Sequence, residues 1–198
     1  MRQLTNPDQK KIVIFASGTG TNAENIIKFF QKSPQARVVA VFSNKRSAKV
    51  LRKAHNLKIK ALHFDWAALY DSNEVLHILE DINPDLIVLA GFMWIFPEDI
   101  IKDFPDKIIN IHPALLPKYG GKGMYGMKVH QAIIENKEKE SGISIHYVSE
   151  KYDEGEVIFQ ATIEISAADT PEVLAEKIHH LEYKHFPEVI QQLLENKK

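Results

Sequence analysis

Short apolar runs alternate with amphipathic segments along the first 111 residues, and this alternation constrains the fold more than any other feature. The first run, 11–16, is rich in β-branched residues without interruption, which is typical of a strand buried on both faces, and the run 85–90 has the same character. The segments between the runs place apolar residues at helical spacing. The strands are expected over 11–16, 36–44, 58–62, 85–90 and 107–111, and the helices over 23–30, 47–55, 71–82 and 97–104. This order predicts an α/β fold with a mostly parallel, doubly wound sheet.

The pattern changes after residue 111, where a loop rich in proline and glycine extends to about residue 126. The elements expected beyond it are a helix over 127–136, strands over 142–148 and 155–165, and a helix over 171–194. A turn separates the two strands, so they could form an antiparallel C-terminal extension. Thr170 suits the N-cap of the last helix and Pro171 its first position, whereas Pro187 should end or kink it. With no linker or repeat in view, we expect one domain over 1–198, with a loose tail over 1–9.

The composition excludes several classes of protein and site. The chain has 198 residues, enough for one α/β domain, and no cysteine, so disulfides, zinc–thiolate sites and cysteine nucleophiles are excluded. Its 25 basic and 26 acidic residues give no indication of a nucleic-acid partner. The N-terminus lacks the apolar segment of a signal peptide, and the longest apolar run, 86–96, is too short to span a bilayer. We therefore expect a cytoplasmic protein without membrane contact.

The turn SGTGTN, Ser17 to Asn22, lies between the first strand and the first helix. Backbone N–H groups and the helix dipole favour an anion at such a place, so phosphate is the natural ligand. The turn is not a P-loop, because no Lys-Ser/Thr pair follows, and it lacks the third glycine of a dinucleotide fingerprint. A tight turn without any ligand is the alternative.

Asn110 and His112 stand at the carboxyl end of the strand expected over 107–111, where ligands bind in open α/β sheets. Residues two apart on a strand project to the same face, so the amide and the imidazole could converge on one atom and form an oxyanion hole. They could equally well only hydrogen-bond the following loop.

Asp153 lies in the turn between the last two expected strands, where aspartate is an ordinary turn residue. The histidines do not indicate a metal site, because none forms a His-x-x-x-His pair on a helix and no carboxylate cluster frames one. We therefore expect no metal.

Five segments, taken together, resemble the glycinamide ribonucleotide formyltransferase family, the folate-dependent formyltransferases of purine synthesis. The segments are SGTGTN (17–22), VLAGFMWI (88–95), INIHPALLPKYGG (109–121), SIHYVSEKYDEG (144–155) and HHLEYKHFP (179–187). The resemblance extends from about Lys11 to Leu194, and the NIHPALLP segment with its downstream aspartate turn is highly specific to folate-dependent formyl transferases and hydrolases. It implies a Rossmann-like domain that passes formyl from the cosubstrate 10-formyltetrahydrofolate to the amine of glycinamide ribonucleotide.

The resemblance also implies roles for particular residues. The catalytic trio would be Asn110, His112 and Asp153. The phosphate and ribose of glycinamide ribonucleotide would contact Gly20, Thr21, Asn22 and Glu182. Folate would contact Met93, Trp94, Ile95, Phe96, Asn110, Ser149, Glu150, Lys151, Tyr152 and Asp153. Asn110 and a protonated His112 would stabilise the oxyanion, while Asp153 would raise the pKa of His112 above about 6.5 and assist proton transfer. A cis Leu116–Pro117 bond is also expected.

Three departures from the family pattern leave the trio untouched. Trp94 replaces a basic residue, the glycine-rich loop 119–127 is lengthened and suggests a mobile lid, and no Lys or Arg occurs over 61–84. Recognition of the folate glutamate tail therefore stays open. The partners expected are small-molecule substrates, and the chain could be a monomer or a homodimer.

The alternatives with the same trio are methionyl-tRNA formyltransferase, formyltetrahydrofolate deformylase and a sugar-nucleotide formyltransferase. The first adds a tRNA-binding domain, the second a preceding regulatory domain, and the third tends to be longer. The SGTGTN turn suits a simple phosphate monoester and favours glycinamide ribonucleotide. A non-catalytic Rossmann-like binding module is the alternative from another class, but a mere binder has no need of all three residues of the trio.

Overall fold

The computed structural model describes residues 9–196. The tail expected over 1–9 therefore lies outside the described residues, except for Gln9. The Gln9 amide donates hydrogen bonds to the carbonyl oxygens of Ser33 and Ala36, so Gln9 is anchored and not loose. The chain divides into two compact units, the first formed by residues 1–92 and 190–198 and the second by residues 93–189. One domain over the whole chain stays a prediction.

The first unit contains a four-stranded parallel sheet in the order β3-β2-β1-β4. Its strands are β1 (Lys10–Phe15), β2 (Ala36–Ser43), β3 (Lys60–His63) and β4 (Leu86–Leu89). The last four residues of β1 and all of β4 are buried, as expected for strands covered on both faces. The parallel part of the predicted sheet is therefore confirmed.

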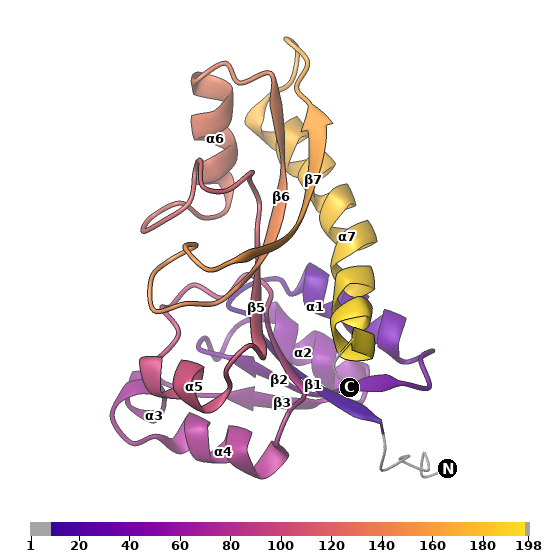
Figure 1. Cartoon of the computed structure of the whole chain (residues 1–198), viewed down its shortest axis with the longest axis vertical. Coiled ribbons are helices and arrows are strands. Elements are labelled where there is room, and N and C mark those ends of the chain that lie inside the picture. Colours follow the sequence, from indigo (N-terminus) through magenta and orange to yellow (C-terminus); the bar gives the residue numbers. More distant parts are fainter. Residues whose placement is uncertain (1–8, 197–198) are drawn as a thin grey trace. The chain divides into compact units, whose positions relative to one another are not determined.

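The helices of this unit are α1 (Thr21–Phe30), α2 (Lys49–Asn56), α3 (Trp66–Tyr70) and α4 (Glu74–Ile82). Figure 1 shows α1 and α2 on one face of this sheet and α3 and α4 on the other. This follows from right-handed crossovers, because the chain first moves outward from β1 to β3 and then returns to β4 on the far side of β1. Helix α3 was not predicted. It has only five residues, too few for a periodic pattern, and it is started by Asp65, whose side chain accepts a hydrogen bond from the Ala68 N–H.

Aromatic side chains fill the core of the first unit near the carboxyl ends of β1 and β2. The Phe15 ring stacks on Phe42 at a centroid distance of 4.8 Å and meets the edges of Phe64 and Phe92. This packing supports the loop that leaves β1.

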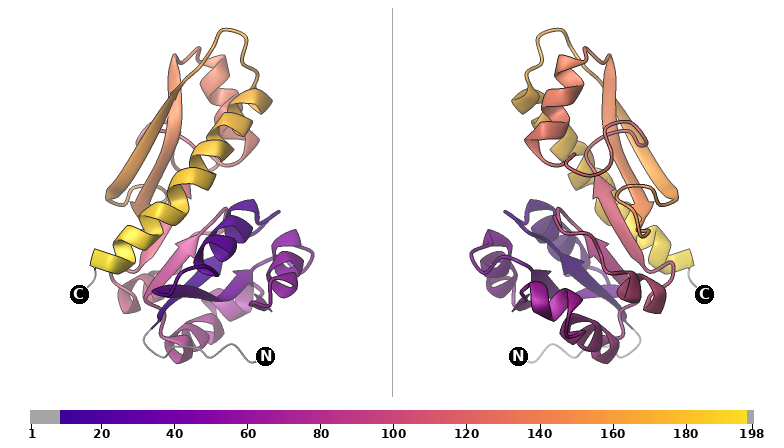
Figure 2. Two further views of the ribbon diagram at one scale, coloured as in Figure 1. Left: turned by 90° about the vertical axis from the view of Figure 1, so that its right-hand side faces the viewer. Right: turned by 90° about the vertical axis from the view of Figure 1, so that its left-hand side faces the viewer.

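The second unit contains the antiparallel strands β5 (Ile108–His112), β6 (Glu140–Tyr147) and β7 (Val157–Glu164). The antiparallel extension is confirmed, and β5 belongs to this antiparallel set, with Ile109 opposite Tyr147. The helices are α5 (Glu98–Asp103), α6 (Met127–Glu135) and α7 (Pro171–Asn196), of which α7 belongs to this unit up to Val189. In Figure 2, the part of α7 that belongs to this unit crosses β6 and β7 on one face.

The prediction for the last helix is confirmed at its start and over its length, whereas an end at Pro187 is wrong and a kink there stays a prediction. The Thr170 hydroxyl accepts a hydrogen bond from the Val173 N–H at 3.4 Å, as an N-cap does. Helix α7 does not end at Pro187 but continues through it to Asn196. The buried side chains of Phe186 and Ile190 hold the helix on both sides of the proline, so packing outweighs one lost backbone hydrogen bond.

Candidate functional site

Strand β5 presents Asn110 and His112, and the antiparallel partner β6 places His146 directly opposite Asn110. Both histidines are buried, with 3% and 2% of His112 and His146 exposed. The Asn110 Nδ2 atom donates to His146 Nε2 at 3.1 Å, while His146 Nδ1 lies 2.8 Å from the Tyr147 carbonyl oxygen. His146 is therefore the tautomer that donates from Nδ1 and accepts at Nε2. The sequence did not single out His146, although alternation along β6 places it on the face that meets Asn110.

Asp153 comes from the turn after β6 and joins the same group. Its Oδ2 atom lies 3.5 Å from His112 Nδ1 and accepts the Gly121 N–H at 2.9 Å. Its Oδ1 atom accepts from Asn110 Nδ2 at 3.4 Å and lies 3.6 Å from His146 Nε2. The structure thus brings the three predicted residues together and adds His146 as a fourth.

The electrostatics of His112 differ from the expectation. Its Nε2 atom donates to the Tyr119 carbonyl oxygen at 2.7 Å. Burial lowers the pKa of His112, and this effect outweighs the opposing influence of Asp153 and the Tyr119 carbonyl. The expected rise in the pKa of His112 is therefore wrong, because the strand and the loop remove water from the ring as they bring the carboxylate near.

Burial and local contacts also act in opposite directions on the pKa of Asp153, but there the contacts outweigh burial. Burial by itself raises the pKa of Asp153, but the nearby His146 side chain, the charge of His112 and the Gly121 N–H together lower it below the ordinary value. Asp153 is therefore a carboxylate at neutral pH, able to accept hydrogen bonds from the side chains around it.

The two prolines after His112 belong to a loop that β6 and β7 hold in place. The Leu116–Pro117 bond is cis, as the resemblance implied. The buried Ser144 hydroxyl donates to the Ala114 carbonyl at 2.7 Å and accepts the Leu116 N–H at 2.9 Å. Gln160 of β7 donates to both the Ser144 hydroxyl and the Leu116 carbonyl. These bonds position the backbone that follows His112.

The glycine pair at the end of this loop lies against the trio. A Cβ at Gly120 would lie 2.6 Å from Leu116 Cδ2 and 3.3 Å from Asp153 Cβ, while the Gly121 N–H bonds the Asp153 carboxylate. Just before them, the Tyr119 hydroxyl donates to Glu138 at 2.9 Å. A side chain at Gly120 would require the Leu116 side chain to shift, and Gly121 has φ 92°, which side chains rarely adopt, so glycine is favoured where the loop passes close to Asp153. The mobile lid suggested over 119–127 stays a prediction.

The two segments expected to contact folate both belong to the second unit. In the first, Met93 is exposed, Trp94 and Ile95 are half-buried and Phe96 is buried. In the second, Tyr152 is exposed next to Asp153, Ser149 donates to the Lys151 carbonyl, and Lys151 pairs with Glu154. Glu150 interacts with the side chain of Glu98, which follows the first segment after one proline, so the two segments lie close together.

Glu182 of α7 is a buried carboxylate, only 5% exposed. Its Oε2 atom lies 2.9 Å from His179 Nδ1, one helical turn away, and this contact raises the pKa of His179. Helix α6 contributes a buried histidine, His130, whose Nδ1 atom has no hydrogen-bond partner among the described residues. Glu182 was expected from the resemblance, whereas His130 had no signal beyond its residue type.

In the first unit, the predicted phosphate turn has the geometry of an open helix N-terminus. Gly20 is the N-cap of α1 with φ 68°, and no side chain caps the helix. A Cβ at Gly20 would lie 2.3 Å from Val50 Cγ2 and 2.9 Å from the Val50 Cα atom, so only glycine fits there. Thr21 and Asn22 form the first turn, and N–H groups at such a position lack intrahelical partners.

Asn44 is a further buried polar residue of the first unit that the sequence did not single out. It follows the carboxyl end of β2. Because Phe42 of β2 pairs with Phe15 at the end of β1, this end of β2 lies beside the start of the turn after β1. Both amide atoms of Asn44 are buried without a hydrogen-bond partner among the described residues. Because an orphaned buried amide is costly, this place is suited to a polar ligand.

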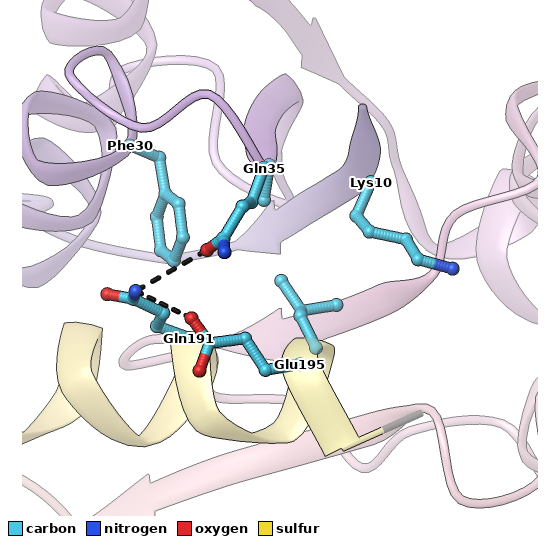
Figure 3. A pocket seen from close by; sticks show the side chains of 7 residues that line it. Lys10, Phe30, Gln35, Gln191 and Glu195 are labelled. Carbon is cyan, nitrogen blue, oxygen red and sulfur yellow. Dashed lines mark hydrogen bonds between the residues drawn. The ribbon is translucent and has the colours of Figure 1, made fainter. Parts of the chain in front are cut away.

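A separate hollow in the first unit is less suited to a ligand. Figure 3 shows Phe30, Gln35, Gln191 and Glu195 around it. The Gln191 amide donates to both Gln35 and Glu195, so the polar groups at its centre already bond one another. None of the predicted site residues lines it.

Residues 9–196 lack two features. No cluster of three or more histidines or carboxylates in that range could hold a metal ion. No helix in the same range is long and apolar enough to cross a membrane.

Comparisons with known proteins agree along nearly the whole chain. The formyl transferase family model matches residues 10–190. The phosphoribosylglycinamide formyltransferase of Bacillus subtilis (strain 168) is 35% identical over 191 residues, which cover 93% of this chain and 95% of the relative. That of Escherichia coli (strain K12) is 35% identical over 185 residues, covering 90% and 84%. A chloroplastic relative from Arabidopsis thaliana is 36% identical over 96% of this chain, which spans 68% of that longer protein.

Solved structures agree with these relatives. Glycinamide ribonucleotide transformylase 1 from Symbiobacterium toebii superposes with a TM-score of 0.87 at 31% identity, over 97% of this chain and 91% of that one. Phosphoribosylglycinamide formyltransferase from Bacillus halodurans gives a TM-score of 0.84 at 34% identity, over 96% and 97%.

Proposed function

Because the chain belongs to the formyl transferase family, we propose that it transfers the formyl group of 10-formyltetrahydrofolate to the amine of glycinamide ribonucleotide. Like its named relatives, it is a transferase of purine biosynthesis. One observation carries the residue assignment. One carboxylate, that of Asp153, lies within 3.5 Å of both the Asn110 amide and the His112 imidazole.

The trio is suited to the charge that this reaction develops. The amine nitrogen attacks the formyl carbon, a C–N bond forms, and the carbonyl electron pair moves onto the formyl oxygen. His112 directs an N–H at a carbonyl oxygen in this structure, that of Tyr119, so its Nε2 atom is oriented as an oxygen donor. We assign the formyl oxygen of the transition state to this donor and to the Asn110 amide, which together form an oxyanion hole.

Asp153 assists the transfer of the proton that must leave the attacking nitrogen. Collapse of the tetrahedral intermediate breaks the bond between the formyl carbon and the folate nitrogen, which takes up a proton. Asp153 is ionised and partly accessible, so it can hold a water that carries this proton from one nitrogen to the other. The Gly121 N–H and the Asn110 amide hold the carboxylate in place. No step requires a metal.

The folate cosubstrate is assigned to Met93–Phe96 and Ser149–Asp153. The observations that support this are the exposed apolar surfaces of Met93 and Tyr152 and the closeness of the two segments. An aromatic pterin stacks well on such surfaces. The phosphate of glycinamide ribonucleotide is assigned to Gly20, Thr21 and Asn22. The Asn44 amide, which has no partner in the described part of the chain, supports a polar ligand there. The ribose is assigned to Glu182.

The test is an assay of 10-formyltetrahydrofolate turnover with and without glycinamide ribonucleotide. We expect release of tetrahydrofolate only when the amine is present. Release that ignores the amine would identify a hydrolase, and no release in either case would identify a binding module. A cytoplasmic location, a monomeric or homodimeric state and the absence of a nucleic-acid partner stay predictions of the sequence.

A further inference from the structure

We propose that His130 is a positioning residue for the acceptor substrate. Together with Glu182, His130 binds a ribose hydroxyl of glycinamide ribonucleotide. This inference rests on the proposed function, because it takes the acceptor as given. It adds a residue that neither the sequence motifs nor the catalytic trio includes.

The first observation is the state of the His130 ring. Helix α6 buries Val129, His130 and Ile133, and His130 is 3% exposed. Its neighbours in this stripe are apolar, yet the imidazole Nδ1 atom is buried without a hydrogen-bond partner among the described residues. Leaving such a nitrogen unpaired costs free energy that an apolar side chain would avoid. A ligand that bonds this nitrogen offsets that cost.

The second observation is the surroundings of His130. Figures 1 and 2 show α6 beside the first half of α7, on one face of β6. The side chains of Glu182, His179 and His112 all act electrostatically on His130. His112 is in turn affected by Glu182 as well as by Asp153. His130 therefore belongs to the polar group that contains both the trio and the carboxylate assigned to the ribose.

The chemistry of these side chains selects the ligand class. Burial lowers the pKa of His130, so its ring is neutral at pH 7 and has one donor and one acceptor nitrogen. A hydroxyl can satisfy Nδ1 in either tautomer, because it both donates and accepts. The Glu182 carboxylate accepts hydrogen bonds and repels a phosphate, so the ligand group that suits it is a donor such as O–H. The two adjacent hydroxyls of a ribose match a carboxylate and a neutral imidazole.

The test replaces His130 by Phe, which keeps a ring of similar volume but makes no hydrogen bond. Its effect is compared with His130→Gln, which retains an acceptor and donors, and with His180→Phe, the same change at an exposed histidine of α7. Steady-state kinetics at saturating 10-formyltetrahydrofolate would give kcat and KM for glycinamide ribonucleotide. Calorimetry without folate would give Kd for that substrate and for inorganic phosphate.

We expect His130→Phe to raise KM and Kd for glycinamide ribonucleotide about tenfold, with kcat within about threefold and Kd for phosphate unchanged. His130→Gln should recover part of the loss, and His180→Phe should match the parent protein. Addition of glycinamide ribonucleotide should also shift the ring ¹⁵N resonances of His130 in the parent protein.

Unchanged KM and Kd in a folded His130→Phe protein would overturn the proposal, as would a loss confined to kcat. The proposed function fails separately, if the parent protein itself does not formylate glycinamide ribonucleotide.

Discussion

The Nε2 atom of His112 lies 2.7 Å from the carbonyl oxygen of Tyr119, and it donates its proton there. An imidazole N–H aimed at a carbonyl oxygen is the arrangement that an oxyanion donor needs. The contact comes from the loop that follows β5, seven residues after His112. In the proposed reaction the formyl oxygen takes over this hydrogen bond, so Tyr119 must give way when the substrates bind.

Replacing His112 by Gln should lower kcat about 10²–10³-fold, because removal of one oxyanion donor has an effect of this order. His63→Gln, at an exposed histidine in β3, should leave kcat unchanged. Single-turnover measurements with both substrates prebound would separate the chemical step from binding. Near-parental rates in a folded His112→Gln protein would remove His112 from the oxyanion hole.

The pKa of His112 also predicts how stability depends on pH. Burial places its folded pKa below the unfolded value of about 6.5, so between these two values the unfolded chain binds more protons. The free energy of unfolding should therefore fall as the pH drops below about 6.5, and this loss is complete below the folded pKa.

Denaturant titrations of the parent and of His112→Gln at pH 7.5, 6.5 and 5.5 would isolate this contribution. His179, whose pKa is raised, and His130, whose pKa is lowered, are present in both proteins and cancel in the difference. We expect the parent to lose stability relative to the variant toward acid pH. A constant difference, or one of opposite sign, would contradict the lowered pKa of His112.

Two glycines of the same turn should respond differently to alanine. Gly20→Ala adds a Cβ 2.3 Å from Val50 Cγ2 and strains a backbone with φ 68°, so α1 and α2 must move apart. Gly18→Ala meets nothing within 4 Å. We expect Gly20→Ala to raise Kd for glycinamide ribonucleotide at least tenfold and to destabilise the fold, while Gly18→Ala does neither. Equal effects of the two variants on thermal unfolding and on calorimetric binding would show that the Gly20 geometry is not required.

Two buried serines on β6 offer a matched pair for the loop after His112. Ser144→Ala leaves the Ala114 carbonyl, the Leu116 N–H and the Gln160 amide without this partner, and should cost about 1–3 kcal/mol of stability. Ser141→Ala removes a buried hydroxyl that has no partner among the described residues, so it should be neutral or stabilising. Urea denaturation would measure both, and a larger loss from Ser141→Ala would refute this account of the loop.

Much of the fold followed from local pattern. The apolar runs at β1 and β4, where burial on both faces requires apolar residues without interruption, and their alternation with helical segments predicted the parallel sheet of the first unit. The five-residue α3 was missed because its start depends on one hydrogen bond to Asp65 and not on periodicity. The sequence left open whether the last helix ends or kinks at Pro187, because packing on either side of the proline decides that it continues.

The sequence by itself determined that Asn110 and His112 stand on one face at the end of a strand, since the period of a strand is two residues. The family resemblance added Asp153. Only the tertiary structure decided what these groups are next to. It brought Asp153 to Gly121 across 32 residues, placed His146 opposite Asn110 and buried His112 enough to lower its pKa. It also left the Nδ1 atom of His130 without a partner within residues 9–196. Burial and hydrogen bonding depend on groups that are distant along the chain, so local pattern does not contain them.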